Sequence, residues 1–132
     1  MQLLLVMIGG ALGAGARHLA GRAALALMGP GYPWGTLFVN LLGGALMGLL
    51  AGGLARASGA GVGTGEPWRL FLGVGVLGGF TTFSAFALDT VLLWQRGEAA
   101  AAAGYVLLSV AGAVGGIFAG LAIARGTMGG AA

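Results

Sequence analysis

The sequence predicts an all-α membrane protein with four transmembrane helices in each subunit. Hydrophobic residues make up 58% of the 132 residues and charged residues only 7%, whereas soluble domains average about 25% charged residues. Four long uncharged runs are separated by charged or turn-forming residues, and glycines recur at four-residue spacing within the runs. Long apolar runs can cross the hydrocarbon core of a bilayer, and small residues four apart let helices pack closely.

A turn with two prolines separates the first two helices. We expect the first helix at about residues 3–27, which places Arg17 and Arg22 inside it or beside it. The sequence Met-Gly-Pro-Gly-Tyr-Pro at residues 28–33 then ends this helix, because glycine and proline are the strongest helix breakers. The second helix is expected at about residues 34–55.

The third helix is expected at about residues 68–95, with a break at its centre. Leu70–Leu88 has no charged residue and is long enough to span the membrane, yet Gly-Gly-Phe-Thr-Thr occupies residues 78–82. The hydrocarbon core holds no water to satisfy broken backbone hydrogen bonds. Broken helices are therefore tolerated there where they line a cavity or bind an ion. The break indicates a channel or a transporter.

The fourth helix is expected at about residues 100–124, so that residues 1–132 form one domain with both termini on one side of the membrane. Three arginines would lie on that side and three on the other, namely Arg56, Arg69 and Arg125 against Arg17, Arg22 and Arg96. Since positive charge sets orientation, this balance predicts insertion in both orientations. The alternative is that some of these arginines do not affect topology. Four helices are few for enclosing a pathway, which favours a homodimer.

Few residues are available for other classes of function. The six basic residues are scattered, so we expect no nucleic-acid-binding surface. The absence of cysteine excludes thiol catalysis, disulfides and thiolate metal sites. One histidine and three acidic residues leave little material for a hydrolytic site, so we do not expect an enzyme.

The residues at and after the break could face an ion or simply pack. Phe83 and Phe86 are three apart and share a helix face. Aromatic ring edges are electropositive and can face an anion, but packing against lipid or core explains the pair equally well. Thr81, Thr82 and Ser84 could line a pathway or bond back to the preceding turn.

Other polar residues could form a ladder of neutral donors. Asn40 offers two amide hydrogens, either to a neighbouring helix or to a pathway. Thr36 lies one turn earlier on the same face, and Tyr105 and Ser109 form a similar pair on the fourth helix. Arg17 is expected near a helix end, where it reaches the membrane interface or forms an electropositive vestibule.

Three motifs together resemble the fluoride-channel family called Fluc or CrcB. They are Gly-Gly-Ala-Leu-Gly-Ala-Gly-Ala-Arg-His at residues 9–18, Gly-Thr-Leu-Phe-Val-Asn-Leu-Leu-Gly at residues 35–43, and Gly-Gly-Phe-Thr-Thr-Phe-Ser-Ala-Phe at residues 78–86. The resemblance covers most of the chain. It implies a multi-pass channel in the cell (inner) membrane that exports cytoplasmic fluoride passively. The channel would be an antiparallel, dual-topology homodimer with two pores.

The resemblance also implies roles for individual residues. Phe83 and Phe86 match the family's pore phenylalanines, Asn40 matches its pore asparagine, and the hydroxyls of the fourth helix match as well. We therefore expect the fluoride pore to be lined by Thr36, Asn40, Thr82, Phe83, Ser84, Phe86, Tyr105 and Ser109, with Arg17 in a vestibule.

A structural sodium ion is the cofactor that the resemblance implies. It would be held at the dimer centre by the backbone carbonyls of Gly78 and Thr81 from both subunits, which is reasonable because hard cations take oxygen ligands. Asp89 stands where an acid is expected. Ala85 and Ala113 depart from the family pattern, since hydroxyl residues are common at both places. The polar track would be thinner as a result.

A small dual-topology, proton-coupled multidrug exporter is the alternative from a different class. That mechanism requires a membrane-embedded carboxylate in the first helix, and residues 1–16 have none. A packing subunit that transports nothing is a third interpretation, against which the polar, broken third helix argues.

Overall fold

The computed structural model describes residues 1–59 and 65–129, with side chains described to residue 126. The helices are α1 (Gln2–Met28), α2 (Trp34–Gly59), α3 (Glu66–Trp68), η1 (Arg69–Leu77), α4 (Gly78–Phe80), α5 (Phe83–Gln95) and α6 (Ala99–Gly129). Four spans are long and apolar enough to cross a membrane: α1, α2, the series from α3 to α5, and α6. The all-helical, four-span prediction is confirmed.

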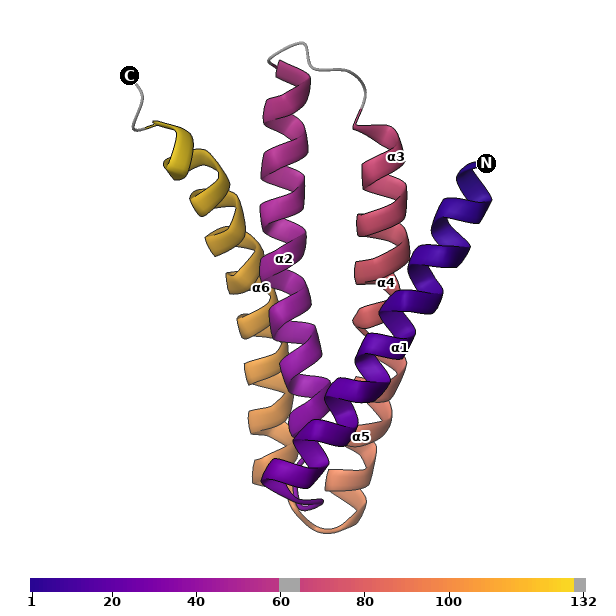
Figure 1. The fold of residues 1–132 in the computed structure, drawn as a ribbon. Helices are drawn as coiled ribbons and strands as arrows, with labels where there is room; N and C mark the ends of the chain where they lie inside the picture. The colour runs from indigo at the N-terminus through magenta and orange to yellow at the C-terminus, as the bar shows by residue number, and fades with distance from the viewer. Residues whose placement is uncertain (60–64, 130–132) are drawn as a thin grey trace.

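The four spans converge at one end of the molecule and diverge at the other. Figure 1 shows them meeting near the α1–α2 loop and the α5–α6 turn, and spreading toward the end that carries both termini. Along their lengths, α2 packs on α6, and α1 packs on η1 and α4. The fold therefore consists of two helix pairs that are joined at the narrow end.

Glycines bring the helices of each pair into backbone contact. A Cβ atom added to Gly13 on α1 would meet the carbonyl oxygen of Val76 and would lie 2.8 Å from the nitrogen of Phe80. A Cβ atom added to Gly44 on α2 would lie 2.6 Å from the carbonyl oxygen of Ala113 on α6. The close packing that the spaced glycines predict is present in both pairs.

A small core lies at the narrow end, and most other large apolar side chains are exposed. The core is made of Leu37, Leu93, Ala102 and Tyr105, which come from the ends of α2, α5 and α6. Elsewhere, exposed leucine, valine and methionine side chains occupy the outer faces of the helices. This distribution suits a bundle whose outside faces lipid, where apolar side chains cost nothing to expose.

The third span is interrupted within the predicted segment 78–82, at its last two residues, whereas Gly78–Phe80 is helical. After the single turn of α4, Thr81 (φ −85°, ψ 159°) and Thr82 (φ −152°, ψ 125°) are extended, and α5 begins at Phe83. The preceding segment η1 is a π-helix over Arg69–Leu77, which the sequence did not predict. Such wide turns are rare and often accompany functional sites. The break and η1 together make this span the irregular one.

Candidate functional site

The break is closed by a side chain from a neighbouring helix. The Nδ2 of Asn40 on α2 donates to the carbonyl of Thr82 at 2.9 Å, and its Oδ1 accepts from the N–H of Thr82 at 2.8 Å. The Thr82 Oγ1 in turn accepts from the N–H of Ala85 at 3.2 Å, as a cap for α5, and lies 3.4 Å from the Oγ of Ser84. These polar groups form a connected cluster at the break.

The backbone carbonyls of Gly78 and Thr81 are among those that lose their helical donors as a consequence. In an unbroken helix, the N–H of Thr82 would reach the carbonyl of Gly78, and the N–H of Ala85 would reach that of Thr81. Both N–H groups are directed elsewhere, to Asn40 and to the hydroxyl of Thr82. The hydroxyl of Thr81 bonds back to the carbonyl of Leu77 at 2.9 Å. The carbonyl oxygens of Gly78 and Thr81 are therefore released from the helix.

Arg17 brings a positive charge to the break. It lies well inside α1, and its Nε donates to the carbonyl of Gly79 at 3.1 Å, so its expected position near a helix end is wrong. The reason is that α1 continues past Arg17 to Met28. The helices also approach closely, since a Cβ atom on Gly79 would lie 2.5 Å from the carbonyl oxygen of Gly10. At that separation the arginine reaches a carbonyl of the broken span rather than the membrane interface.

A column of aromatic rings runs from the break to the α1–α2 loop. The ring centroids are 5.6 Å apart for Phe83 and Phe86, 5.3 Å for Phe86 and Tyr105, and 5.7 Å for Tyr105 and Tyr32. Tyr32 then contacts Trp34 at 4.6 Å. Phe83 is 78% exposed on the single chain, whereas Tyr105 is fully buried. The tilted and edge contacts are those that aromatic rings prefer.

Of the two predicted hydroxyl groups on α6, that of Tyr105 has a hydrogen-bond partner and that of Ser109 has none among the described residues. Tyr105 donates to Oδ2 of Asp89 at 3.0 Å, so this acid pairs with a phenol rather than with an arginine. Ser109 is buried, and its Oγ has no hydrogen-bond partner among the described residues. A buried hydroxyl without a partner costs about 1–3 kcal/mol. It is therefore a group with the capacity to bind a ligand.

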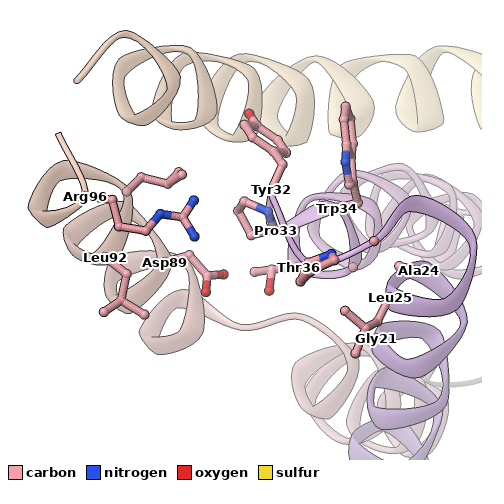
Figure 2. A pocket seen from close by; sticks show the side chains of 14 residues that line it. Gly21, Ala24, Leu25, Tyr32, Pro33, Trp34, Thr36, Asp89, Leu92 and Arg96 are labelled. Carbon is pink, nitrogen blue, oxygen red and sulfur yellow. The ribbon is translucent and has the colours of Figure 1, made fainter. Parts of the chain in front are cut away.

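A cavity of about 350 Å³ lies at the narrow end, between the α1–α2 loop and α5. Figure 2 shows Thr36, Asp89 and Arg96 directing polar groups into the space beneath Tyr32 and Pro33. Partial burial raises the pKa of Tyr32 above its ordinary value, so its hydroxyl stays protonated at neutral pH. The cavity is lined by neutral donors, one acid and one base.

The predicted site residues gather at two places. The first is the break, with Arg17, Asn40, Gly78, Thr81, Thr82 and Ser84. The second is the narrow end, with Thr36 and with Tyr105, which bonds Asp89. Ser109 follows one turn after Tyr105 on α6 and has no hydrogen-bond partner among the described residues. Phe83 and Phe86 connect the two. The sequence analysis did not predict Tyr32 and Trp34 as part of the site. The only indication in the sequence was the presence of two aromatic residues on either side of Pro33.

Comparisons with known proteins identify the family. The family model described as "CrcB-like protein, Camphor Resistance (CrcB)" matches residues 4–121. The chain is 58% identical over 123 residues to the fluoride-specific ion channel FluC of Phenylobacterium zucineum (strain HLK1), covering 93% of this chain and 94% of that one. It is 58% identical over 113 residues to FluC of Sphingopyxis alaskensis, covering 86% of each chain. It is 51% identical over 124 residues to FluC of Mesorhizobium japonicum, covering 94% and 96%. With this coverage and identity, and with four spans of which the third is broken, the chain belongs to the CrcB family.

Proposed function

We propose that this chain is a fluoride-selective channel through which cytoplasmic fluoride leaves the cell passively. The observation that carries the proposal is the broken third span, whose polar cluster continues into a column of aromatic rings. The relatives that share 51–58% of its sequence are named as fluoride-specific channels. A membrane-embedded break with neutral donors around it is suited to an ion pathway.

Neutral donors suit fluoride because the ion must lose its water and still leave the protein. A pore has to offer enough replacement contacts for entry and bind weakly enough for release. Asn40 uses one of its two amide hydrogens on Thr82, which leaves the other for an ion. Ser109 supplies a buried hydroxyl, and Phe83 and Phe86 supply electropositive ring edges.

The proposed route follows these groups from the break to the cavity. It starts at the Asn40–Thr82 pair, passes along Phe83 and Phe86, and reaches Tyr105. The residues assigned to it are Thr36, Asn40, Thr82, Phe83, Ser84, Phe86, Tyr105 and Ser109, with Arg17 supplying a positive charge beside the break.

A structural sodium ion fits the carbonyls that the break releases. Gly78 and Thr81 present backbone oxygens without their helical donors, and oxygen ligands are those that hard cations bind. Gly78 is exposed on the single chain, so a second copy can bring an equivalent pair of oxygens to the same place. When bound, the ion would tie two broken spans together without being transported.

An antiparallel homodimer is the assembly that we propose. Phe83 and Ser84 are exposed beside the break, where a pore requires a second wall. With Arg17 bonded at the break, three arginines remain toward the end that carries the termini and two toward the narrow end, namely Arg56, Arg69 and Arg125 against Arg22 and Arg96. A difference of one charge sets only a weak orientation bias.

The topology is tested by labelling a C-terminal tag from each face of the membrane. Dual topology predicts equal accessible fractions on the two faces. Several lysines added after Arg125 should fix one orientation and abolish fluoride transport. A tag that is found on one face only in the unmodified protein would contradict the proposal.

The proton-coupled exporter gains no support from the structure. Its mechanism requires a carboxylate in the first span, and α1 contains no acidic residue. Asp89 on α5 is engaged by the Tyr105 hydroxyl.

The decisive test of function is ion efflux from liposomes that contain the purified protein. Fluoride and chloride are loaded separately and measured with ion-selective electrodes. Fluoride should leave rapidly, and chloride should leave at the rate of protein-free liposomes. Equal rates for the two anions would refute a fluoride-selective channel, and proton-driven efflux of organic cations would favour the exporter.

A further inference from the structure

Arg96 joins the end of α5 to the α1–α2 loop. Its Nη2 donates to the carbonyl of Gly31 at 3.0 Å, across 65 positions of sequence. Its Nε lies 3.1 Å from Oε1 of Glu98, and its Nη2 also donates to Oε2 of Glu98 at 3.4 Å. Gly97, with φ +79°, makes the tight turn that brings Glu98 into this position. The guanidinium is therefore bonded both to the α1–α2 loop and to Glu98.

The α1–α2 loop has few other bonds to hold it. Gly29 has φ +80°, and Pro30 and Pro33 have no N–H to donate. The backbone bonds of the loop run to its own neighbours, such as the N–H of Trp34 to the carbonyl of Tyr32 at 2.8 Å. Among the described residues, the hydrogen bond from Arg96 to Gly31 connects this loop to another span, whereas the other hydrogen bonds of the loop run to α1, to α2 or within the loop.

This loop carries the ring that ends the aromatic column. Tyr32 follows Gly31 directly, and its ring meets the buried ring of Tyr105 edge-on, at 5.7 Å and 86°. The same loop and Arg96 both line the cavity, with the guanidinium of Arg96 directed toward Pro33 (Figure 2). The bond to Gly31 therefore acts on the residue next to the one that contacts Tyr105.

We infer that Arg96 is a positioning residue for the proposed fluoride route. By holding the Gly31 carbonyl, it keeps Tyr32 against Tyr105 and so sets the width of the route at the narrow end. The inference rests on the proposed function for its effect on transport. Arg96 acts through Tyr32 and is not itself assigned to contact the ion.

Arginine is suited to this task and lysine is not. Arg96 uses two nitrogens of one planar group: Nε faces Oε1 of Glu98, and Nη2 donates both to the Gly31 carbonyl and, at 3.4 Å, to Oε2 of Glu98. A lysine keeps the charge but has a single nitrogen on a flexible stem, so it loses the fixed orientation. The Arg96–Glu98 pair is nearly half exposed, and pairs of that kind add little to stability. Loss of Arg96 should therefore disturb the loop without unfolding the protein.

The first experiment measures fluoride efflux and loop position in Arg96→Gln and Arg96→Lys. Loop position is read by acrylamide quenching of Trp34, which contacts Tyr32, after Trp68→Phe and Trp94→Phe remove the other tryptophans. Arg96→Gln should lower efflux several-fold and increase quenching, with an unchanged thermal unfolding temperature. Arg96→Lys should recover efflux only in part. Full recovery by lysine would assign Arg96 a purely electrostatic role and would overturn the inference.

A matched control and a double variant sharpen the result. Arg69 forms a comparable exposed pair with Glu66, at 2.7 Å, near the other end of the bundle, so Arg69→Gln should change neither efflux nor quenching.

In a Tyr32→Leu background, Arg96→Gln should cause little further loss of efflux, because the effects of coupled residues are not additive. Additive losses, or unchanged quenching in Arg96→Gln, would refute a role through Tyr32. If the unmodified protein passes no fluoride, the proposed function fails, and the quenching measurements still decide whether Arg96 positions Tyr32.

Discussion

Asn40 and Thr82, 42 positions apart, form a closed pair in which one side-chain amide both donates to and accepts from one backbone residue. The pair sits where the third span leaves its helical path. An unpaired backbone group away from water costs about 1–3 kcal/mol, so Asn40 offsets the part of the cost of the break that comes from Thr82. The same amide keeps a second hydrogen, which connects the stability of the break with its proposed role.

Replacing Asn40 with leucine should lower both stability and fluoride efflux. Leucine has similar bulk but leaves the N–H of Thr82 without its partner and removes the Asn40 donor from the Thr82 carbonyl, so the thermal unfolding temperature of the protein in detergent should fall. Asn40→Asp keeps an acceptor but adds a negative charge, and it should lose efflux more completely than stability. Thr90→Val is the control, because the Thr90 hydroxyl bonds only within α5, to the Phe86 carbonyl at 2.9 Å. An Asn40→Leu protein with normal stability and efflux would contradict this account.

Phe83→Ile and Phe86→Ile should each reduce fluoride efflux strongly while the protein still assembles. Isoleucine keeps apolar bulk and removes the electropositive ring edge. Phe118→Ile is the matched control, since Phe118 on α6 is 70% exposed and has no assigned role. Efflux rates and size-exclusion profiles are compared for the three variants. Normal efflux in both α5 variants would reduce these phenylalanines to packing residues.

Gly13→Ala should destabilise the protein, and Gly15→Ala should not. A Cβ atom on Gly13 meets the backbone of η1 and α4, whereas one on Gly15 meets nothing within 4 Å. Overpacking a close contact costs about 1–3 kcal/mol, and alanine is otherwise the better helix former by about 1 kcal/mol. Thermal unfolding of the two variants provides the measurement. Equal destabilisation by both substitutions would show that the contact between α1 and the third span is not the cause.

Fluoride efflux should depend on sodium, and this dependence should survive Thr81→Val. The proposed ligands are backbone oxygens, so valine removes the Thr81 hydroxyl bond to Leu77 and leaves the carbonyl in place. Exchange of sodium for a large organic cation during reconstitution should lower efflux, and sodium should restore it. A ligand that binds only the folded dimer also stabilises it by mass action, so the unfolding temperature should rise with sodium. If neither the fluoride efflux nor the unfolding temperature changes with sodium, the proposed sodium site is refuted.

Helix positions could be predicted to within a few residues because charge and proline placement decide them. Pro30 and Pro33 end α1 and allow α2 to begin at Trp34, as expected. The predicted end of the second helix at residue 55 was too early, since α2 continues to Gly59. Arg56 marks the edge of the apolar run, but an arginine at the end of a membrane helix can extend to the interface without ending it. The π-helical conformation of η1 could not be predicted, because the hydropathy of a segment does not show which carbonyl each N–H bonds.

The site could be predicted by residue type but not by partner. Glycine and threonine pairs in an uncharged run indicate a break, and a membrane asparagine indicates a polar contact, so Asn40 and Thr82 stood out separately. Their pairing, like that of Arg17 with Gly79 across 62 positions, depends on how two helices approach. The glycine and proline residues beside Tyr32 predict a turn there. They do not predict the contact of Tyr32 with Tyr105, which depends on how the loop folds.

The partly buried charge of Arg17 has a consequence for how the protein responds to ionic strength. Dissolved salt screens surface charges over about 10 Å at 0.1 M, but it screens buried groups far less. Arg17 is bonded to a carbonyl inside the bundle, whereas Arg96 and Arg125 are exposed to the surrounding solution. The attraction that Arg17 exerts on an anion at the break would therefore persist in concentrated electrolyte, after the surface arginines have lost their influence. The affinity of the break for an anion would then depend less on ionic strength than an affinity set by surface charges.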